Sequence, residues 1–574
     1  MTYREMFARR LQLVVVLMVI IAVALLARLV AIQFQLDPEE VAYLQGLRSY
    51  TRLREILPTR GQIYDRGGEL LAVNTLEYEI GANPPFIADP AAVARQLAVV
   101  LNTDELELFN ALSSDQPWVL LARPVSSAVG QAVVDLDIFG ISVAPIPRRA
   151  YPQGTLGAQV LGFVSYDKIG RYGVEGAYQS DLAGESLVDE ESAIPFEISP
   201  SLGPRHGRDL VLTVDRDVQF LAESELLRAI EESGAEQGTI IIMDPRTGAI
   251  LAMASYPSFD PNAFYEVTDA RVMVNPAISA QYEPGSVFKV VTMAVAIEAG
   301  AVLPNSTYND VGLIECGGVE VYNWDRQPHG LIDMTQVLVQ SLNVGTSYIV
   351  REMLGATRFY QGLQAFGIGQ PTLVDLEGEA SGTLLLPGDQ GWRESQLCTN
   401  SFGQGLAVTP LQMLTAVNAI ANDGLMMQPH VVHQIIDGET VYTTQPSPIG
   451  RPISAQTARL VRDMMVQVVL QNVSEAQLPG YTVAGKTGTA QIPIPGGYEE
   501  GASIATFVGF LPADHPQVSI LIKLDRPDEY WASLVIPPIF ARLAEQLMVL
   551  LEIPPDQVRH ELAAQGGIVE AIDR

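Results

Sequence analysis

Lysine is scarce in this chain. Among 574 residues there are four, Lys168, Lys289, Lys486 and Lys523, and the other basic positions are arginine. Acidic residues outnumber lysine and arginine by 66 to 35, which leaves a formal net charge of −31. A nucleic-acid-binding surface needs clustered positive charge, and no run of arginines provides it. The composition therefore excludes nucleic acid as a partner and makes each lysine a position that needs an explanation.

Cysteine and histidine are also few. The two cysteines, Cys316 and Cys398, have neither C-x-x-C nor zinc-ligand spacing. The six histidines form no metal-ligand pattern either. We therefore expect neither a metal nor a cofactor. The sequence does not supply the Cα separation that decides whether the two thiols pair, and unpaired thiols are the favoured interpretation.

One long apolar run lies near the N-terminus. Residues 11–34 are long enough to cross a hydrocarbon core of ~30 Å as a helix. The run is too long for a signal-peptide core and no A-x-A-like site follows, which favours an uncleaved anchor. Arginines before it and acidic residues after it predict a single-pass cell-membrane protein with residues 1–10 in the cytoplasm and the rest outside. Arg28 either snorkels to the outer interface, the favoured interpretation, or faces a partner helix.

Beyond the anchor the sequence changes character twice, as expected for a chain too long for one compact domain. Residues 35–235 alternate short apolar runs with glycine, proline and charged turns, which predicts an irregular, β-rich module without a catalytic cluster. Residues 236–552 carry clearer strand and helix patterns. Residues 553–574 are interpreted as a C-terminal tail.

The third segment predicts an α/β domain. Two hairpins are expected, one pairing residues 238–243 with 249–255 and one pairing 502–510 with 517–524, because turn residues separate apolar runs there. The helical patterns between the hairpins cover 286–299, 334–353 and 410–422. Strand pair, helices and strand pair together indicate a mainly antiparallel sheet flanked by helices.

The first reactive pattern is the serine and lysine of Y-E-P-G-S-V-F-K. Pro284 and Gly285 break the preceding structure, so Ser286 lies at the positive end of the following helix, with Lys289 on the same face. A buried lysine can lose its proton near neutral pH and arginine cannot, so Lys289 could act as the base for Ser286. The alternative is an ordinary helix cap and a surface lysine. S-x-x-K alone is weak, since residues 165–168 also fit it.

Two further motifs strengthen the functional interpretation. Ser341 and Asn343 form an S-x-N triplet, and K-T-G follows at residues 486–488. S-x-x-K, S-x-N and K-T-G in this order are the signature set of penicillin-recognising serine acyltransferases. The set places Lys289 and Lys486 in one site, where their mutual repulsion would help to keep one of them neutral.

Residues 480–487 also match the G-x-x-x-x-G-K-[ST] phosphate loop. That loop needs a strand before it and a helix directly after it. Here a proline precedes the match, its interior is strand-like, and T-A-Q-I-P-I-P-G-G follows. We therefore predict that this segment binds no nucleotide.

With these motifs in place, the chain resembles a class B penicillin-binding protein, a membrane-anchored peptidoglycan D,D-transpeptidase of division or elongation. The resemblance implies the penicillin-binding transpeptidase fold, with residues 35–235 as a non-catalytic pedestal or dimerisation-like module. Besides the three motifs it rests on R-G-Q-I-Y-D-R-G-G-E-L-L-A at 60–72, G-V-E-G-A-Y-Q-S-D-L at 173–182, N-W-D at 323–325 and F-G-Q-G at 402–405.

The resemblance implies a serine acyl-enzyme. Ser286 would attack the penultimate D-alanine carbonyl of a peptidoglycan stem ending in D-Ala-D-Ala, and Lys289 would take the serine proton. Ser341 could relay a proton to the leaving amine, and Asn343 could hydrogen-bond the substrate amide. A second stem's amine would then attack the ester, and β-lactams would remain attached to Ser286.

The resemblance also implies how substrate is held. Lys486, Thr487 and Thr489 would bind the terminal carboxylate, and Gly488 would leave room for substrate against the strand. The backbone N–H groups of Ser286 and Thr489 would form the oxyanion hole.

Other functions share the motifs. A β-lactamase needs an efficient water-activating base and seldom carries an anchor and a long N-terminal module. A β-lactam sensor would need signalling parts on the inner side, where only residues 1–10 are expected. A non-catalytic division or elongation scaffold need not retain all three motifs.

Glycan polymerisation would come from a partner, because no segment between the anchor and the catalytic part resembles a glycosyltransferase. The resemblance implies a SEDS-family polymerase that contacts the anchor and the N-terminal module. The sequence does not separate division from elongation, identify the acceptor amine of the stem, or reveal the oligomeric state.

Overall fold

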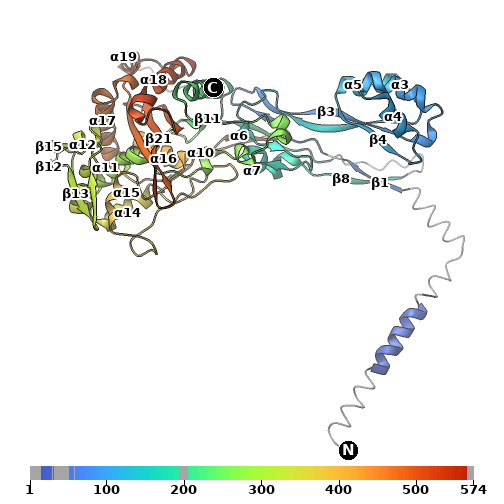
Figure 1. Ribbon diagram of the computed structural model, residues 1–574, viewed down its shortest axis with the longest axis horizontal. Coiled ribbons are helices and arrows are strands. Elements are labelled where there is room, and N and C mark those ends of the chain that lie inside the picture. Colours follow the sequence, from blue (N-terminus) through green and yellow to red (C-terminus); the bar gives the residue numbers. More distant parts are fainter. Residues whose placement is uncertain (1–14, 29, 31–50, 57, 193–203, 565–574) are drawn as a thin grey trace, which may run out of the picture. The chain divides into compact units, whose positions relative to one another are not determined.

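The computed structural model describes residues 15–28, 30, 51–56, 58–192 and 204–564 (Figure 1). Contacts divide the chain into two compact units. One comprises residues 1–58 and 184–206, and the other comprises residues 59–183 and 207–574. In the first unit, strand β1 (Thr51–Ile56) pairs antiparallel with β8 (Leu187–Ser192).

The described part of the predicted anchor is an apolar helix, Val15–Arg28. Most other positions of the predicted span, and the predicted cytoplasmic residues, lie outside the described residues. Among the described residues, one helix is both long and apolar enough to cross a membrane, α18 (Ala532–Leu550), but 44% of its most apolar window is buried inside the fold. Its Phe540 packs on Phe507 of the sheet with ring centroids 4.6 Å apart. We therefore interpret α18 as a core helix.

A five-stranded antiparallel sheet forms the centre of the second unit, in the order β11-β10-β22-β21-β20. Its strands are β10 (Gln237–Met243), β11 (Ile250–Tyr256), β20 (Ala484–Ile494), β21 (Gly497–Leu511) and β22 (Val518–Asp525). The central strands are buried on both faces, which explains their nearly continuous apolar sequence. Both predicted hairpins are confirmed, and the K-T-G motif lies on the edge strand β20.

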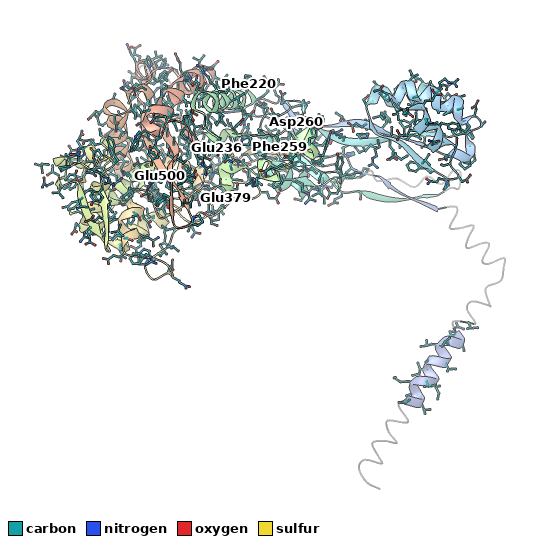
Figure 2. All side chains as sticks on the ribbon, viewed as in Figure 1. Phe220, Glu236, Phe259, Asp260, Glu379 and Glu500 are labelled. Atoms are coloured by element: carbon teal, nitrogen blue, oxygen red, sulfur yellow. A yellow bond between two sulfur atoms is a disulfide. The ribbon has the colours of Figure 1, made fainter. Side chains whose placement is uncertain are left out.

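Helices cover this sheet. The amphipathic helix α9 (Arg216–Ser233) contacts β10, β11 and α18, while its outward-facing Phe220 is 65% exposed (Figure 2). Helix α16 (Pro410–Ala421) is buried over its whole length and contacts β10, β22 and α11 (Lys289–Glu298). Neither α9 nor α17 (Ala455–Gln471) was among the predicted helices.

The helix predictions differ from the structure at functional points. The predicted helix 286–299 begins as a 3-10 turn, η4 (Gly285–Phe288), and becomes α-helical at Lys289. The predicted helix 334–353 is broken into α12 (Met334–Val339), α13 (Asn343–Tyr348) and the π-helix η5 (Ile349–Leu354). The break falls at Ser341, whose φ of 55° lies in the left-handed region.

The N-terminal part of the second unit has its own small core. Strand β3 (Leu70–Ala82) pairs with β4 (Val119–Val125) and β5 (Ile141–Ala150), and α3 (Pro90–Leu101), α4 (Glu105–Leu112) and α5 (Ser127–Asp135) pack with them (Figure 1). The β-rich character predicted for residues 35–235 is therefore only partly right, because helices as well as strands form this part of the chain.

The remaining elements that the site and the predictions use are short. They are β12 (Thr307–Asp310), β13 (Leu313–Cys316), β14 (Val319–Tyr322), β15 (Gly330–Asp333), α7 (Gly173–Ala177), α15 (Ser395–Ser401) and α19 (Asp556–Ala564).

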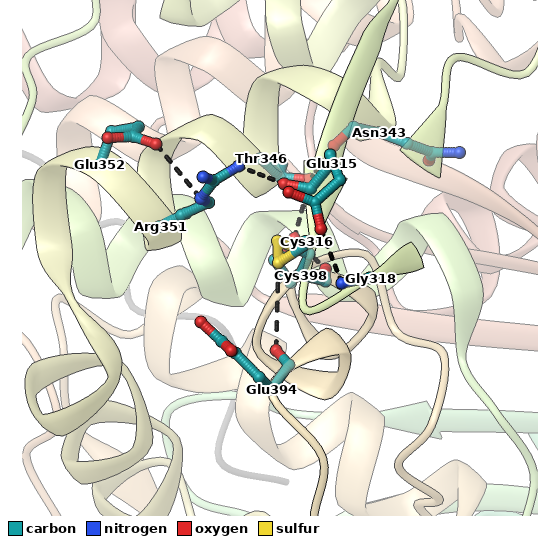
Figure 3. Close-up of a disulfide and its surroundings, with 10 residues drawn as sticks. Glu315, Cys316, Gly318, Asn343, Thr346, Arg351, Glu352, Glu394 and Cys398 are labelled. Atoms are coloured by element: carbon teal, nitrogen blue, oxygen red, sulfur yellow. Dashed lines mark hydrogen bonds and ion pairs between the residues drawn. A yellow bond between two sulfur atoms is a disulfide. The ribbon is translucent and has the colours of Figure 1, made fainter. Parts of the chain in front are cut away.

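Cys316 and Cys398 form a disulfide, with their Cα atoms 6.3 Å apart (Figure 3). The interpretation of two unpaired thiols is therefore wrong. The error arose because 82 residues separate the cysteines in sequence, and only the fold brings β13 beside α15. Both sulfur atoms lie in a small apolar cluster with Val321 and Phe402. The disulfide thus links the β13–β14 hairpin to the segment that carries F-G-Q-G.

We expect the double variant Cys316→Ala/Cys398→Ala to be less stable than the natural chain by about 2–4 kcal/mol, because a cross-link over a long loop restricts the unfolded chain. Urea unfolding of both proteins measures the difference. Treatment with a reductant should lower the unfolding midpoint of the natural chain and leave that of the variant unchanged. Equal unfolding midpoints for the oxidised natural chain and the variant would contradict the prediction.

Candidate active site

A cleft of about 330 Å³ brings together segments far apart in the sequence. Five of the predicted site residues line it, namely Ser286, Ser341, Asn343, Thr487 and Thr489. Lys289 and Lys486 lie behind this lining, 0% and 1% exposed. The three motifs therefore meet in one place.

Ser286 is presented by the 3-10 turn η4 and is partly exposed. The preceding Gly285 has a φ of 58°, and its N–H donates to the Gly403 carbonyl at 3.0 Å. A Cβ on Gly285 would come within 3.0 Å of the Thr489 carbonyl oxygen. Glycine is therefore needed here for both conformation and space.

Lys289 points into the site and not toward solvent, which excludes the surface-lysine alternative. Its Nζ donates to the Ser341 carbonyl oxygen at 2.6 Å, to Asn343 Oδ1 at 2.8 Å and to Ser341 Oγ at 3.3 Å. Burial and then the nearby Lys486 ammonium lower the pKa of Lys289 well below its ordinary value. Both effects favour the neutral form of this amine.

The Ser341 hydroxyl lies between two amines. Lys486 Nζ donates to Ser341 Oγ at 3.1 Å and to the Thr487 carbonyl oxygen at 3.0 Å. Burial lowers the pKa of Lys486 to about 7. Desolvation is thus the main cause for both lysines, and their predicted repulsion adds to it for Lys289. The Lys289–Ser341–Lys486 arrangement can pass a proton along hydrogen bonds.

The lowered pKa of Lys486 predicts a pH effect on stability. Between pH values of about 7 and 10.5 the unfolded chain holds this proton and the folded chain has released it, so the free energy of unfolding rises with pH across that window. We expect the free energy of unfolding of Lys486→Met to rise less steeply with pH than that of the natural chain. The difference in slope should correspond to at most about one proton. Urea unfolding at several pH values tests this, and identical slopes would contradict it.

The edge strand β20 places its side chains alternately. Thr487 and Thr489 line the cleft, and Thr489 Oγ1 accepts a hydrogen bond from the Ala532 N–H at 3.0 Å. A Cβ on Gly488 would come within 2.8 Å of the Pro284 carbonyl oxygen. Gly488 therefore has a packing role, and its predicted role of leaving room for substrate stays a prediction. The glycine lets the turn that carries Ser286 pack directly on the strand.

Two other sequence matches carry no comparable site. Residues 480–487 lead into strand β20, which continues to Ile494, so the helix that a phosphate loop needs does not follow. The second S-x-x-K match, residues 165–168, is a turn in which Ser165 Oγ donates to the Ile169 carbonyl oxygen at 2.8 Å and Lys168 has a φ of 64°. The structure therefore supports neither a phosphate loop at residues 480–487 nor a second serine–lysine site at residues 165–168.

Two tryptophans that had no predicted role also line the cleft. The Trp324 and Trp531 ring centroids are 5.6 Å apart in an edge-to-face arrangement, and the side chains are 57% and 39% exposed. The Trp324 indole N–H donates to the Gln340 carbonyl oxygen at 3.1 Å. Trp324 is the middle residue of N-W-D, so the motif indicated its importance, but nothing in the sequence indicated its pairing with Trp531.

Comparison with known proteins places the chain. The model of the penicillin-binding protein transpeptidase domain matches residues 238–545, and that of the penicillin-binding protein dimerisation domain matches residues 55–191. The chain belongs to the class B penicillin-binding proteins. The stage V sporulation protein D of Bacillus subtilis is 32% identical over 98% of this penicillin-binding protein and 89% of its own length.

Other relatives agree with that assignment. A probable peptidoglycan D,D-transpeptidase, PbpC of Pseudomonas aeruginosa, is 31% identical over 96% of each chain. The crystal structure of penicillin-binding protein 3 from Mycobacterium tuberculosis, complexed with aztreonam, is 30% identical to this penicillin-binding protein, with a TM-score of 0.69 over 88% of this chain and 98% of that one.

Proposed function

We propose that this penicillin-binding protein is a peptidoglycan D,D-transpeptidase that works through a serine acyl-enzyme. The observation that carries the proposal is the Ser341 hydroxyl held between two buried amines of lowered pKa, in the cleft that Ser286 lines. On this proposal residues 236–552 form the catalytic domain, and residues 35–235 the non-catalytic module.

In the first half-reaction, Ser286 Oγ attacks the carbonyl carbon of the penultimate D-alanine while neutral Lys289 takes the hydroxyl proton. The peptide C–N bond then breaks, and the terminal D-alanine leaves with a proton that Ser341 relays. Lys289, Ser341 and Lys486 form the hydrogen-bonded path for that proton. The product is an ester between the stem peptide and Ser286.

In the second half-reaction, the amine of another stem attacks that ester. The C–O bond to Ser286 breaks, a peptide crosslink forms, and the serine recovers its proton. Asn343 is a candidate partner for the substrate amide, because one of its Nδ2 protons is used by the Tyr322 carbonyl oxygen at 3.1 Å and Nδ2 carries a second. In the first half-reaction, Lys486, Thr487 and Thr489 bind the carboxylate of the terminal D-alanine.

The oxyanion hole is formed by the N–H groups of Ser286 and Thr489. Strand β20 is an edge strand, so main-chain groups on its outer side are free of a sheet partner. Donors aimed at the developing negative charge typically contribute a factor of roughly 10²–10³ to such reactions. A β-lactam would acylate Ser286 by the same steps.

The protein is anchored in the cell membrane with its catalytic domain outside the cytoplasm. The apolar helix Val15–Arg28 supports the anchor. The Cys316–Cys398 disulfide supports an oxidising compartment, because structural disulfides rarely persist in the cytosol. A SEDS-family glycan polymerase is the proposed partner that supplies the glycan strands.

Incubation of the full chain in detergent with glycan strands that carry stem peptides ending in D-Ala-D-Ala tests the proposal. We expect released D-alanine and crosslinked stems in equal amounts, and neither from Ser286→Ala. Release of D-alanine with hydrolysed but not crosslinked stems would replace transpeptidation with a hydrolase, and rapid hydrolysis of penicillin would indicate a β-lactamase. A folded chain that releases no D-alanine would overturn the proposal.

A further inference from the structure

The turn that carries Ser341 and Asn343 has an unfavourable local conformation. Ser341 is not glycine, yet its φ is 55°. Such residues persist only where surrounding contacts hold them. Helix α13, which starts at Asn343, also lacks a side-chain cap from its own N-cap residue, Leu342. Something outside this turn must therefore hold it.

Asn323 supplies the missing cap from another part of the chain. Its Oδ1 accepts the Val344 N–H in the first turn of α13 at 3.1 Å, and its side chain is only 2% exposed. Its Nδ2 donates to Asp310 Oδ2 at 2.7 Å and to the Gln327 carbonyl oxygen at 3.1 Å. One end of the amide must accept and the other must donate, so neither aspartate nor leucine could make the same contacts.

Asp310 in turn orients Asn323. It ends strand β12, it is 1% exposed, and its Oδ2 also accepts the His329 N–H at 3.0 Å. The residue before Asn323 adds a second contact to the same turn, because the Tyr322 carbonyl oxygen accepts Asn343 Nδ2 at 3.1 Å. Adjacent residues of one segment thus hold the adjacent residues 343 and 344.

We propose that Asn323, oriented by Asp310, is a positioning residue that holds Ser341 and Asn343 in their reactive geometry. The inference rests on the proposed function for its chemical meaning. Asn343 Oδ1 and the Ser341 carbonyl oxygen are both acceptors of Lys289 Nζ, so a shift of this turn displaces Lys289 as well. Small misplacements of reacting groups can cost about 10²-fold in rate.

Penicillin acylation of the full chain tests this, with the rate measured against drug concentration so that the limiting rate and the apparent dissociation constant separate. We expect Asn323→Ala to lower the limiting rate by roughly 10–100-fold and to change the dissociation constant by less than about threefold. Glu320→Gln, an exposed change on the same hairpin, is the matched control and should acylate like the natural chain. Asp310→Ala, which removes the acceptor of Asn323 Nδ2, should resemble Asn323→Ala.

A double-mutant cycle separates positioning from general destabilisation. If Asn323 acts through the turn, the loss of rate in Asn323→Ala/Asn343→Ala should be at least about threefold smaller than the product of the two single losses, since coupled residues are not additive. Additive losses, or a limiting rate for Asn323→Ala within threefold of the natural value once normalised to folded protein, would overturn the inference.

Amide hydrogen exchange keeps the inference separable from the proposed function. Asn323→Ala should speed exchange in residues 341–348, and Glu320→Gln should not. A natural chain that penicillin does not acylate would defeat the proposed function, while faster exchange confined to residues 341–348 would still support the positioning contact. Unchanged exchange there would overturn it.

Discussion

Replacing Lys289 with arginine is expected to lower the rate of penicillin acylation by about 10²–10⁴-fold, the usual contribution of a positioned general base. Burial and Lys486 lower the pKa of Lys289, which favours the neutral amine that the proposed role as base requires. A guanidinium stays charged at any physiological pH and cannot take that proton. Stopped-flow mixing of the full chain with a chromogenic β-lactam measures the rate of acylation.

Two further variants make this result interpretable. Lys289→Met removes the amine without adding volume and should be as slow as Lys289→Arg, which separates loss of the base from overpacking. Lys168→Arg changes a lysine in the exposed turn of the second S-x-x-K match and should acylate normally. Acylation by both Lys289 variants at more than a tenth of the natural rate would contradict a role for this amine as the base.

The second large effect is expected in the N-terminal part of the second unit. Glu175 on α7 is 0% exposed and pairs with two arginines. Arg60 Nε donates to its Oε2 at 2.6 Å and Arg149 Nε to its Oε1 at 2.6 Å, while the Tyr151 hydroxyl donates to Oε1 at 3.3 Å. The Glu175 carboxylate therefore links the segment at Arg60, strand β5 and helix α7 to one another.

Glu175→Gln keeps the shape and removes the charge that compensates two buried guanidinium groups. We expect it to lower the free energy of unfolding by about 3–5 kcal/mol, the usual cost of removing one partner from a buried pair. The matched control is Glu77→Gln, which breaks a partly exposed pair with Arg148 and should cost under about 1 kcal/mol. Urea unfolding compares them, and equal losses for the two variants would rule out a special role for Glu175.

The chemistry of the site was largely predictable because it depends on residue types in a fixed order. Ser286, Lys289, Ser341 and Lys486 converge as that order implied, although nothing in the local sequence reveals that Ser341 adopts a left-handed conformation. The predicted helix 334–353 missed that break, because its apolar spacing continues through a turn that only long-range contacts stabilise. Local patterns describe helix propensity. Here the hydrogen bonds from Lys289 to the Ser341 carbonyl oxygen and from the Val344 N–H to Asn323 stabilise a turn against that propensity.

Long-range pairings were the part that sequence could not supply. The Cys316–Cys398 disulfide depends on the folded distance between two distant segments. The packing of Gly488 also depends on a distant segment, since only the fold shows that the turn at Pro284 occupies the space beside it. The sequence motifs at residues 60–72 and 173–182 were recognisable, but their structural role was not. The structure shows that Glu175 of the second motif pairs with Arg60 of the first and with Arg149.

Ser286 is expected to form a stable acyl-enzyme with penicillin. Intact mass spectrometry of the full chain in detergent after incubation with penicillin, followed over time once free drug is removed, tests it most directly. We expect one adduct of the drug's mass that persists for hours on the natural chain and is absent from Ser286→Ala. An adduct on Ser286→Ala, or no adduct on a folded natural chain, would contradict it.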